Sequence, residues 1–189
     1  YFRRRHGYDD LVWRNDMAAN AAAVAAENVA TNGCAADHSN SDWREWMTGE
    51  KAGENLARTS KGPVYAVQHL WYEEISIYTA GSLQHSSTFP NDPRYVQPAD
   101  DIGHYTALIW KNTNDLGCAV ATGANCGNEY ITACQYSNQN GNSMSSDSLG
   151  IPRVANYLSN IPSTNTPTKT AAEVCTEVFG GLKKVGDSG

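Results

Sequence analysis

Hydrophobic and polar residues recur along the chain with two different periods, and these periods predict its secondary structure. Residues 15–32 are rich in alanine and stop before Gly33, which predicts a helix with small side chains that can pack closely. Residues 63–79 return to a helical period of about 3.6 and predict a second helix that opens on Pro63. Three runs rich in β-branched and aromatic residues predict strands at 105–111, 117–122 and 129–136, the last two forming a hairpin.

The remaining segments predict how the chain is organised. Residues 78–101 contain three prolines and no clear period, so we expect a long loop. Residues 161–170 are rich in Ser, Thr and Pro, as in a linker, and 171–189 form a tail whose apolar spacing favours a short helix. Helices that precede an antiparallel hairpin are typical of an α+β fold. We therefore expect one α+β domain over residues 1–160, followed by the linker and the tail.

Composition narrows the classes of function. The 189 residues are 40% hydrophobic and 18% charged, which is typical of a folded core and not of a disordered chain. The net charge of −6 argues against nonspecific nucleic-acid binding, which needs a basic surface. No window reaches the roughly 18 consecutive apolar residues of a transmembrane helix, so we predict no membrane span. Because the first residue is Tyr1 and not Met, we expect a processed or trimmed chain whose signal peptide has been removed.

Cysteine spacing bears on the redox compartment. Five cysteines occur and none lies in a C-x-x-C pair, which argues against a zinc ribbon or a thioredoxin-type site. Cys126 and Cys134 flank a turn and a strand, so a bridge between them could join neighbouring strands. A Cys34–Cys118 bridge would tie the loop after the first helix to the second strand. Disulfides would indicate an oxidising compartment, and scattered reduced cysteines in a cytosolic protein are the alternative. The odd count leaves one thiol over, and Cys175 lies in the tail.

Two carboxylates are candidates for chemistry. Plotted at about 100° per residue, Glu74 falls inside the apolar stripe of the helix at 63–79, whereas Glu73 lies on the far side. A carboxylate on a buried stripe must be paired, hydrogen-bonded or protonated, so Glu74 is either satisfied by local donors or acts in a cleft. Glu54 follows Gly53, and chemistry alone places it in the first turn of a helix, where it would complement the helix dipole. The stripe consists of Val64, Val67, Leu70, Trp71, Ile75 and Tyr78.

Two histidines are candidates for a shared site. His38 lies in a polar loop after Cys34, and His104 begins the first predicted strand. A bridge from Cys34 to Cys118 would bring the loop of His38 beside the strand that follows His104. A single histidine is more often a structural hydrogen-bonding group, so this proximity is the reason to consider the two together.

Ordered motifs in the chain resemble those of the CAP superfamily, which includes cysteine-rich secretory proteins, insect antigen five and plant pathogenesis-related proteins of class one. The run G-H-Y-T-A-L-I-W-K-N-T from Gly103 resembles the first family signature, and I-T-A-C-Q-Y-S-N-Q-N-G-N from Ile131 resembles the second. The run G-E-N-L-A from Gly53 matches a further family motif, and L-V-W from Leu11 matches its L-x-W. The resemblance covers about residues 1–158.

The resemblance implies a three-layer α-β-α sandwich with a central antiparallel sheet. It also implies a cleft formed by His38, Glu54, Glu74 and His104, whose imidazoles and carboxylates would suit a divalent metal such as zinc. Opposed His and Glu side chains could instead form hydrogen-bonded pairs that fix the cleft. The family further implies a secreted, extracellular protein with disulfides among Cys34, Cys118, Cys126 and Cys134.

Two segments depart from the family pattern. The loop at 78–101 is much longer than in plant or yeast members, and in sterol-binding relatives a short loop of this region is implicated in holding the ligand. The segment between His38 and Glu54 is expanded and carries Trp43 and Trp46. These tryptophans either contact a membrane surface or a partner, or cap the local core.

Three functions are compatible with the sequence. The first is a secreted module that binds a lipid, either a sterol or a fatty acid, or serves as an extracellular interaction or defence-type protein. The second is a metal-dependent hydrolase that activates water with the His/Glu set. The third is a toxin-like protein that acts through its surface loops. Because the family has no agreed enzymatic activity, the first is favoured, with a lipid or an extracellular protein as the expected partner.

Overall fold

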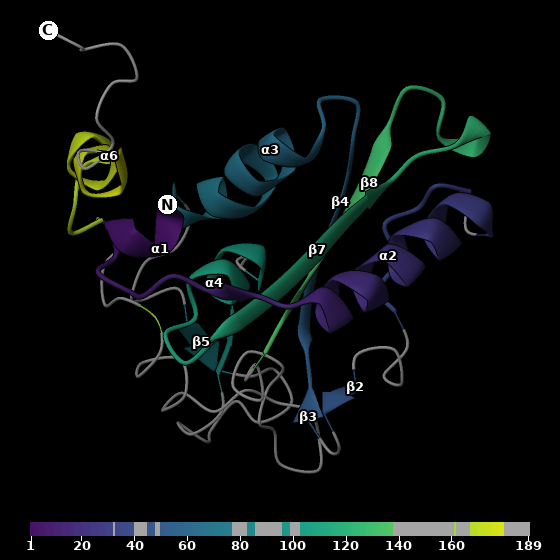
Figure 1. Cartoon of the computed structure of the whole chain (residues 1–189). Coiled ribbons are helices and arrows are strands. Elements are labelled where there is room, and N and C mark those ends of the chain that lie inside the picture. Colours follow the sequence, from purple (N-terminus) through teal and green to yellow (C-terminus); the bar gives the residue numbers. More distant parts are fainter. Residues whose placement is uncertain are drawn as a thin grey trace, which may run out of the picture.

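In the computed structural model the chain forms a four-stranded sheet with helices on both faces (Figure 1). The structure describes residues 1–31, 33–39, 45–47, 50–76, 83–85, 96–98, 103–137, 161 and 167–179. Within these ranges, no helix combines the length and the apolar character needed to cross a bilayer.

The elements follow one another in a mixed order of helices and strands. They are α1 (Phe2–Arg5), β1 (Val12–Trp13), α2 (Asn15–Ala30), β2 (Glu45–Met47), β3 (Glu50–Lys51), β4 (Gly53–Thr59), α3 (Pro63–Tyr65), β5 (Leu83–His85), β6 (Val96–Pro98), α4 (Gly103–Ile109), β7 (Asp115–Ala121), β8 (Tyr130–Tyr136) and α6 (Ala171–Phe179). Helix α3 continues without a break as a π turn (Ala66–Trp71) and a 3-10 turn (Tyr72–Ser76). These three pieces together are called the 63–76 helix.

The main sheet has the strand order β1-β7-β8-β4. Strands β7 and β8 pair antiparallel, as do β8 and β4, whereas the two-residue strand β1 runs parallel to β7. The predicted hairpin and the α+β class are therefore confirmed. The sheet is mixed and not wholly antiparallel, because β1 enters beside β7 in the same direction.

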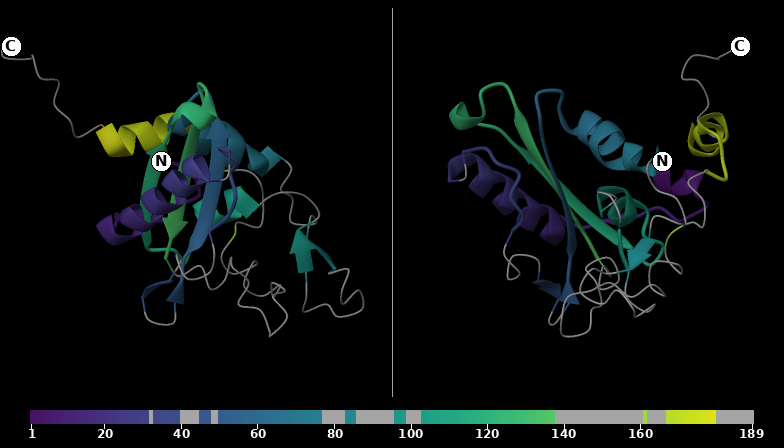
Figure 2. Two further views of the ribbon diagram at one scale, coloured as in Figure 1. Left: turned by 90° about the vertical axis from the view of Figure 1, so that its right-hand side faces the viewer. Right: turned by 180° about the vertical axis from the view of Figure 1, so that it is seen from behind.

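Strand β8 lies between two layers of helices, which gives the α-β-α arrangement (Figures 1 and 2). Its side chains alternate between the two faces of the sheet. Ile131 and Ala133 pack in the cluster formed with α2. Cys134 and Tyr136 pack on the opposite face with Trp71 of the 63–76 helix. The core is thus two apolar layers separated by the sheet.

The first predicted strand is wrong, because residues 103–109 form helix α4. Tyr105, Thr106, Ala107 and Ile109 are all buried, so the helix is covered on nearly every side. Its sequence consequently lacks the contrast between an apolar and a polar face, and a short apolar run is compatible with either structure.

The helix expected to begin at Glu54 is also wrong. Residues Gly53–Thr59 form β4, which pairs along its whole length with β8, and every residue of it except Arg58 is buried. Pairing with a distant strand overrides the local signal.

The predicted helix at 63–79 is confirmed as far as Ser76, but its apolar stripe is only partly right. Trp71 is fully buried, whereas Val64 is 76% exposed and Leu70 is 37% exposed. The π turn at Ala66–Trp71 changes the angular step between residues, so a stripe plotted with a uniform α-helical step drifts away from the buried face.

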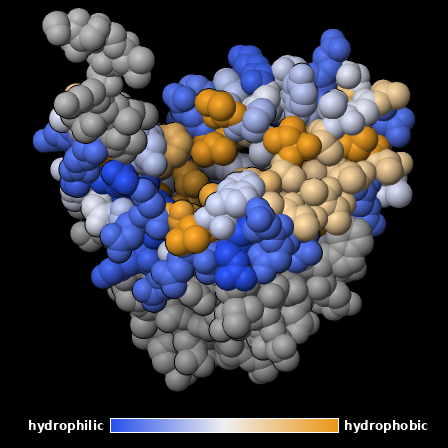
Figure 3. Space-filling model, viewed as in Figure 1, coloured by the Kyte–Doolittle hydropathy of each residue, from blue (hydrophilic) through white to orange (hydrophobic). Residues whose placement is uncertain are grey.

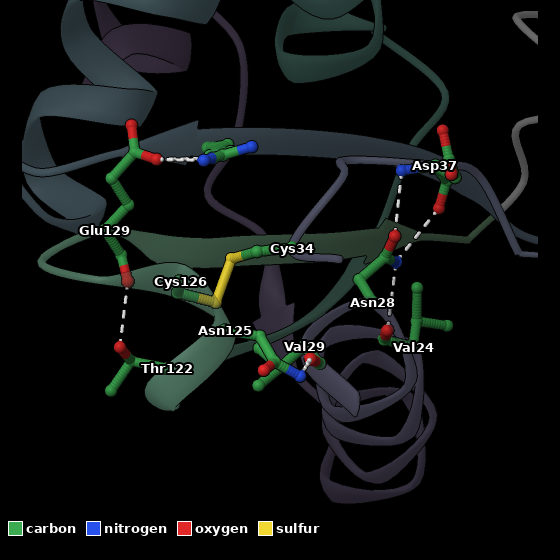
Figure 4. Close-up of a disulfide and its surroundings, with 10 residues drawn as sticks. Val24, Asn28, Val29, Cys34, Asp37, Thr122, Asn125, Cys126 and Glu129 are labelled. Atoms are coloured by element: carbon green, nitrogen blue, oxygen red, sulfur yellow. Dashed lines mark hydrogen bonds and ion pairs between the residues drawn. A yellow bond between two sulfur atoms is a disulfide. The ribbon is translucent and has the colours of Figure 1, made fainter. Parts of the chain in front are cut away.

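All four predicted cysteines form disulfides, but in a different pairing from the one suggested by spacing. The bridges are Cys34–Cys126 and Cys118–Cys134. Cys118 and Cys134 are directly opposed on β7 and β8 and belong to the face of the 63–76 helix. Cys34 and Cys126 belong to the face of α2 (Figure 4). Both suggested pairs would have joined side chains on opposite faces of the sheet, which is why they do not form.

Two other expectations fall partly outside the described residues. Within the predicted loop at 78–101 the structure describes β5 and β6, which pair antiparallel. The helix expected in the tail is observed as α6, and the side chain of Cys175 lies outside the description.

Close packing of α2 on the sheet depends on Gly117 in β7. A Cβ added there would overlap the backbone of Met17 and Ala18 at the start of α2. Neither backbone can yield without moving the helix off the sheet. We expect Gly117→Ala to lower the free energy of unfolding by about 2–3 kcal/mol, the typical cost of overpacking a core. Urea titration followed by tryptophan fluorescence measures this change.

The control is Gly103→Ala, because nothing lies within 4 Å of a Cβ added at that position. It should alter stability by less than about 0.5 kcal/mol. Equal stability of the two variants would show that the packing of α2 on β7 does not require a glycine at position 117.

Candidate functional site

The loop that carries His38 is fixed at both of its ends. The Cys34–Cys126 disulfide ties its start to the tip of the β7–β8 hairpin. Further along, the Asn28 side chain accepts a hydrogen bond from the Asp37 N–H (2.9 Å) and donates one to the Asp37 carbonyl (3.0 Å), as Figure 4 shows. Asn28 is itself buried in the last turns of α2. The His38 loop is therefore held by covalent and polar contacts to two neighbouring elements.

Glu54 pairs with His38 at the beginning of β4. The Nδ1 of His38 lies 3.0 Å from Oε1 of Glu54, and the Ser39 N–H donates to the same oxygen at 3.0 Å. The Ser39 hydroxyl (2.7 Å) and the Gln135 Nε2 (3.0 Å) donate to Oε2. The carboxylate side chain has no exposed surface, whereas the His38 side chain is 59% exposed.

These contacts determine the protonation of the pair. Burial alone would raise the pKa of Glu54, but hydrogen bonds from His38, Gln135 and Ser39 outweigh burial and lower the pKa to about 2. The ionised carboxylate can only accept, so Nδ1 of His38 must carry a proton. When His38 is neutral, its Nε2 is therefore an unprotonated acceptor.

Glu74 pairs with His104 in the same way. Its Oε1 lies 2.5 Å from the His104 Nδ1, and its Oε2 accepts a hydrogen bond from the Tyr105 N–H at 2.9 Å. The Trp71 ring lies nearly parallel to the imidazole, with centroids 6.2 Å apart. Asn55 of β4 donates to the His104 carbonyl at 3.0 Å. The imidazole ring and backbone of His104 are thus held by three different side chains.

The stripe argument correctly separated the two adjacent glutamates. Glu73 points outward and pairs with the half-buried His69, with Nδ1 2.6 Å from Oε1. Glu74 points inward, where only 12% of its side chain is exposed.

Both His–Glu pairs are connected to the start of β4. Glu54 contacts the loop after α2 through its own side chain, and Asn55, the next residue, donates to the backbone of His104 at the start of α4. All four carboxylate oxygens already accept hydrogen bonds, from the two imidazoles and from Ser39, Gln135 and Tyr105. Over the described ranges, no three His, Cys, Asp or Glu side chains form a group that could hold a metal ion. A metal site with four protein ligands stays a prediction. In the two pairs, the atoms that could still coordinate a metal ion are Nε2 of His38 and Nε2 of His104.

Sequence reasoning missed three residues that build the pairs. Gln135 is fully buried, and its Oε1 has no partner among the described atoms. Ser39 and Asn55 act as donors to the pairs. Gln135 stands opposite Glu54 in the β4–β8 register, so the pairing of the strands would have revealed it. Trp43 lies outside the described residues, as does the side chain of Trp46 in β2, and their proposed role stays a prediction.

A second feature is a cavity between α1 and the 63–76 helix, with a volume of about 750 Å³. Figure 3 shows hydrophobic side chains gathered in this region. Phe2 and Tyr72 stack with ring centroids 4.1 Å apart and form part of the wall. The exposed Val64 lies at this cavity, which accounts for an apolar side chain on the outer face of the helix. The aliphatic and aromatic lining consists of Tyr1, Phe2, Pro63, Val64, Val67, Tyr72 and Ile75.

One cationic side chain, Arg5, lines the described part of this cavity. Its Cζ lies 5.9 Å from the centroid of the Tyr72 ring. The acidic side chain in the lining, Glu73, is engaged by His69. The cavity therefore combines apolar walls with one cationic side chain, Arg5, and one acidic side chain, Glu73, which pairs with His69.

Glu54 should make stability depend on pH. Its pKa is about 2 in the folded protein, below the usual 4.5, so it stabilises the fold above pH 4.5 and the contribution is lost as pH falls toward 2. The full contribution is about 3 kcal/mol at 1.4 kcal/mol per pKa unit. We expect Glu54→Gln to be less stable at pH 6 and to lose less stability between pH 5 and 2, as measured by urea unfolding at each pH.

Glu129→Gln is the matched control, because Glu129 pairs with Arg58 at the surface. Its stability should follow the wild-type pH dependence. If Glu54→Gln also followed the wild type, the buried pair would not carry the expected linkage.

Comparison with known proteins agrees with the architecture. The family model described as "Cysteine-rich secretory protein family" matches residues 1–136. Scoloptoxin SSD43 of Scolopendra dehaani is 30% identical over 127 residues, which cover 67% of this chain and 53% of the relative. Cysteine-rich secretory protein 2 of Homo sapiens is 31% identical over 132 residues, covering 67% and 45% respectively. The chain thus spans about half the length of these curated relatives.

One solved structure supports the fold, and a second aligns over part of the chain. Venom allergen-like protein 4 of Schistosoma mansoni aligns with a TM-score of 0.51 at 16% identity, over 91% of this chain and 95% of that one. A structure titled "Crystal structure of NaASP2 with Zn2+" aligns with a TM-score of 0.48 at 23% identity, over 68% and 60%. At 16% identity the first of these alignments supports the fold alone. Together with the family match over most of its length, the sheet and the two disulfides establish that the chain belongs to the cysteine-rich secretory protein, or CAP, family.

Proposed function

We propose that this CAP-family chain acts outside the cell and binds a fatty-acid-like lipid in the cavity between α1 and the 63–76 helix. The observation that carries the proposal is the combination of apolar walls with a single cationic side chain, Arg5. The cavity volume of about 750 Å³ lies within the range of roughly 300–1,000 Å³ that is usual for small-molecule binding sites. An extracellular location is supported by the two disulfides and by relatives named as a scoloptoxin and a secretory protein.

The chemistry of the lining favours an anionic lipid over a sterol. An acyl chain can pack along Val67, Tyr72 and Ile75, where burial of each methylene contributes about 0.8 kcal/mol. A carboxylate beside Arg5 would gain charge-assisted hydrogen bonds. A sterol presents a neutral hydroxyl, which makes no comparable use of the guanidinium. The sterol therefore serves as the competing ligand in the test.

Fatty-acid binding should respond to both parts of the cavity. We expect the wild-type chain to bind a fluorescent fatty acid saturably. Arg5→Gln should weaken binding about tenfold or more, since hydrogen bonds to a charged group are worth about 1.5–3 kcal/mol. Val67→Trp should abolish most binding by filling the cavity. Fluorescence titration at fixed ionic strength measures the dissociation constants, with unlabelled fatty acid and sterol as competitors.

Two variants control for bulk and for charge. Val120→Trp adds the same bulk at an exposed position of β7 outside the cavity, and Arg14→Gln removes a surface charge that pairs with Asp16. Both should bind like the wild type. Absence of saturable binding to the wild type would refute the lipid proposal, and competition by sterol alone would transfer it to a neutral ligand.

As a second function, we propose that His38 and His104 bind zinc through Nε2. The supporting observation is that each Nδ1 already pairs with a glutamate, the arrangement that commonly orients metal-binding histidines. The described carboxylates act in this proposal as orienting groups and not as ligands. Zinc bound there could polarise a ligand oxygen or activate water, which is the chemistry that the hydrolase alternative requires.

Calorimetric titration with zinc tests the second function. His38→Gln and His104→Gln should each weaken zinc binding about tenfold or more, by analogy with the effect of losing groups around a metal site. His69→Gln is the matched control, because His69 forms the same type of pair with Glu73 on the outer surface. Unchanged zinc affinity in both site variants would refute the proposal. Zinc-dependent turnover that disappears in His104→Gln would favour the hydrolase alternative.

A further inference from the structure

The chain beyond the family match returns to the start of the domain and contacts α1. The family model ends at residue 136, whereas α6 spans Ala171–Phe179. In Figures 1 and 2, α6 lies beside α1 in every view. The contact is specific, because residues 168 and 169 hydrogen-bond to one residue of α1.

That residue is Arg5. Its carbonyl accepts hydrogen bonds from the Lys169 N–H at 2.9 Å and from the Thr168 hydroxyl at 3.0 Å. Its own Nε lies 3.5 Å from the Lys169 carbonyl, which it faces as a donor. Backbone and guanidinium of Arg5 are thus both engaged by the same two residues. Arg5 is also one of the residues that line the cavity.

The start of α6 is built to stay in place. Thr170 and Glu173 form a reciprocal capping box, in which the Glu173 carboxylate accepts from the Thr170 N–H (2.6 Å) and the Thr170 hydroxyl accepts from the Glu173 N–H (3.2 Å). Val174, one residue further, is fully buried. The exposed pair between Lys169 and Glu177 adds a contact across the first turns.

Helix α1 (Phe2–Arg5) is held on two sides. On its inner side, Arg3 donates to the carbonyls of Trp110 (2.6 Å) and Thr113 (3.1 Å) and fixes the helix to the end of α4. On its outer side, residues 168 and 169 bond to Arg5, and Arg4 pairs with Asp10. The Arg5 side chain is thus held between Lys169 of the tail and the Tyr72 ring.

We infer that residues 168–174 are a positioning element for the lipid site, which hold α1 so that Arg5 faces the cavity. This inference rests on the proposed fatty-acid function for its consequence, but the hold on α1 can be measured separately. The tail fixes a charge and does not itself touch the acyl chain. Its effect should therefore be confined to ligands with a carboxylate.

Three variants test the hold on α1. Val174→Asp removes the buried anchor of α6, and Thr168→Val removes one hydrogen bond to Arg5 while keeping the shape of the side chain. Thr176→Val is the matched control, because the Thr176 hydroxyl bonds only within α6, to the Ala172 carbonyl. Hydrogen–deuterium exchange is followed at the amides that close α1, those of His6, Gly7 and Tyr8. Exchange there should be about fivefold faster in Thr168→Val and faster still in Val174→Asp, with no change in Thr176→Val.

Binding measurements then test the role in positioning. Affinity for the fatty acid should fall severalfold in Thr168→Val and Val174→Asp, whereas affinity for the uncharged methyl ester should stay the same. In an Arg5→Gln background the tail variants should cause no further loss, because the tail acts through that side chain. A purely structural role would lower the affinity for acid and ester alike.

Each outcome decides one part of the inference. Unchanged exchange at α1 in both tail variants would overturn it. Faster exchange with an unchanged affinity for the fatty acid, or additive losses in the Arg5→Gln background, would also overturn it. If the wild-type chain binds no fatty acid, the proposed function fails, and an exchange effect would still establish the hold on α1.

Discussion

Burial of strand β8 between two helical layers is the constraint on which the rest of the structure depends. Every residue of β8 after Tyr130 is buried, so alternation along one strand assigns each side chain to one of two separate cores. Cys134 faces the 63–76 helix and can reach only a cysteine on that face, which is Cys118 directly opposite. Gln135 faces the other way and reaches Glu54. A shift of one residue in register would exchange the two faces, break the disulfide and leave the buried carboxylate without its donor.

The buried carboxylates follow from the same need to satisfy polar groups in a dry environment. The carboxylate oxygens of Glu54 and Glu74 accept hydrogen bonds from imidazole, hydroxyl, amide and backbone donors. These hydrogen bonds offset the desolvation cost of burying the two carboxylates. The pairs in turn set the orientation of His38 and His104. The His–Glu set is therefore better described as two oriented imidazoles than as four equivalent ligands. The sequence left two alternatives open, hydrogen-bonded His–Glu pairs and a metal-binding cleft. The two are compatible, because the pairs occupy Nδ1 of each histidine and leave Nε2 for the proposed metal.

The sequence predicts those features that depend on local pattern, and fails where distant pairing decides. Helix α2, the β7–β8 hairpin and the inward position of Glu74 come from periodicity that a short window contains. Helix α4 escapes prediction because it is buried nearly all round and lacks an amphipathic contrast. The disulfide pairing and the role of Gln135 require the strand register, which no spacing along the chain encodes. The cavity could not be predicted either, since it needs residues 2–5 to meet a helix sixty residues later.

The 63–76 helix connects the two candidate sites physically. Two adjacent residues of this helix contact the two candidate sites. Trp71 stacks on the His104 ring, and Tyr72 lines the cavity. Trp71 is also fixed to β4 through its Nε1, which donates to the Leu56 carbonyl at 3.2 Å. A ligand that displaced Tyr72 would therefore act on a helix whose other face is pinned to the sheet. If the proposed lipid and zinc both bind, coupling between them must be small when this helix is rigid. If it is appreciable, it must be reciprocal, because each ligand would bias the same element.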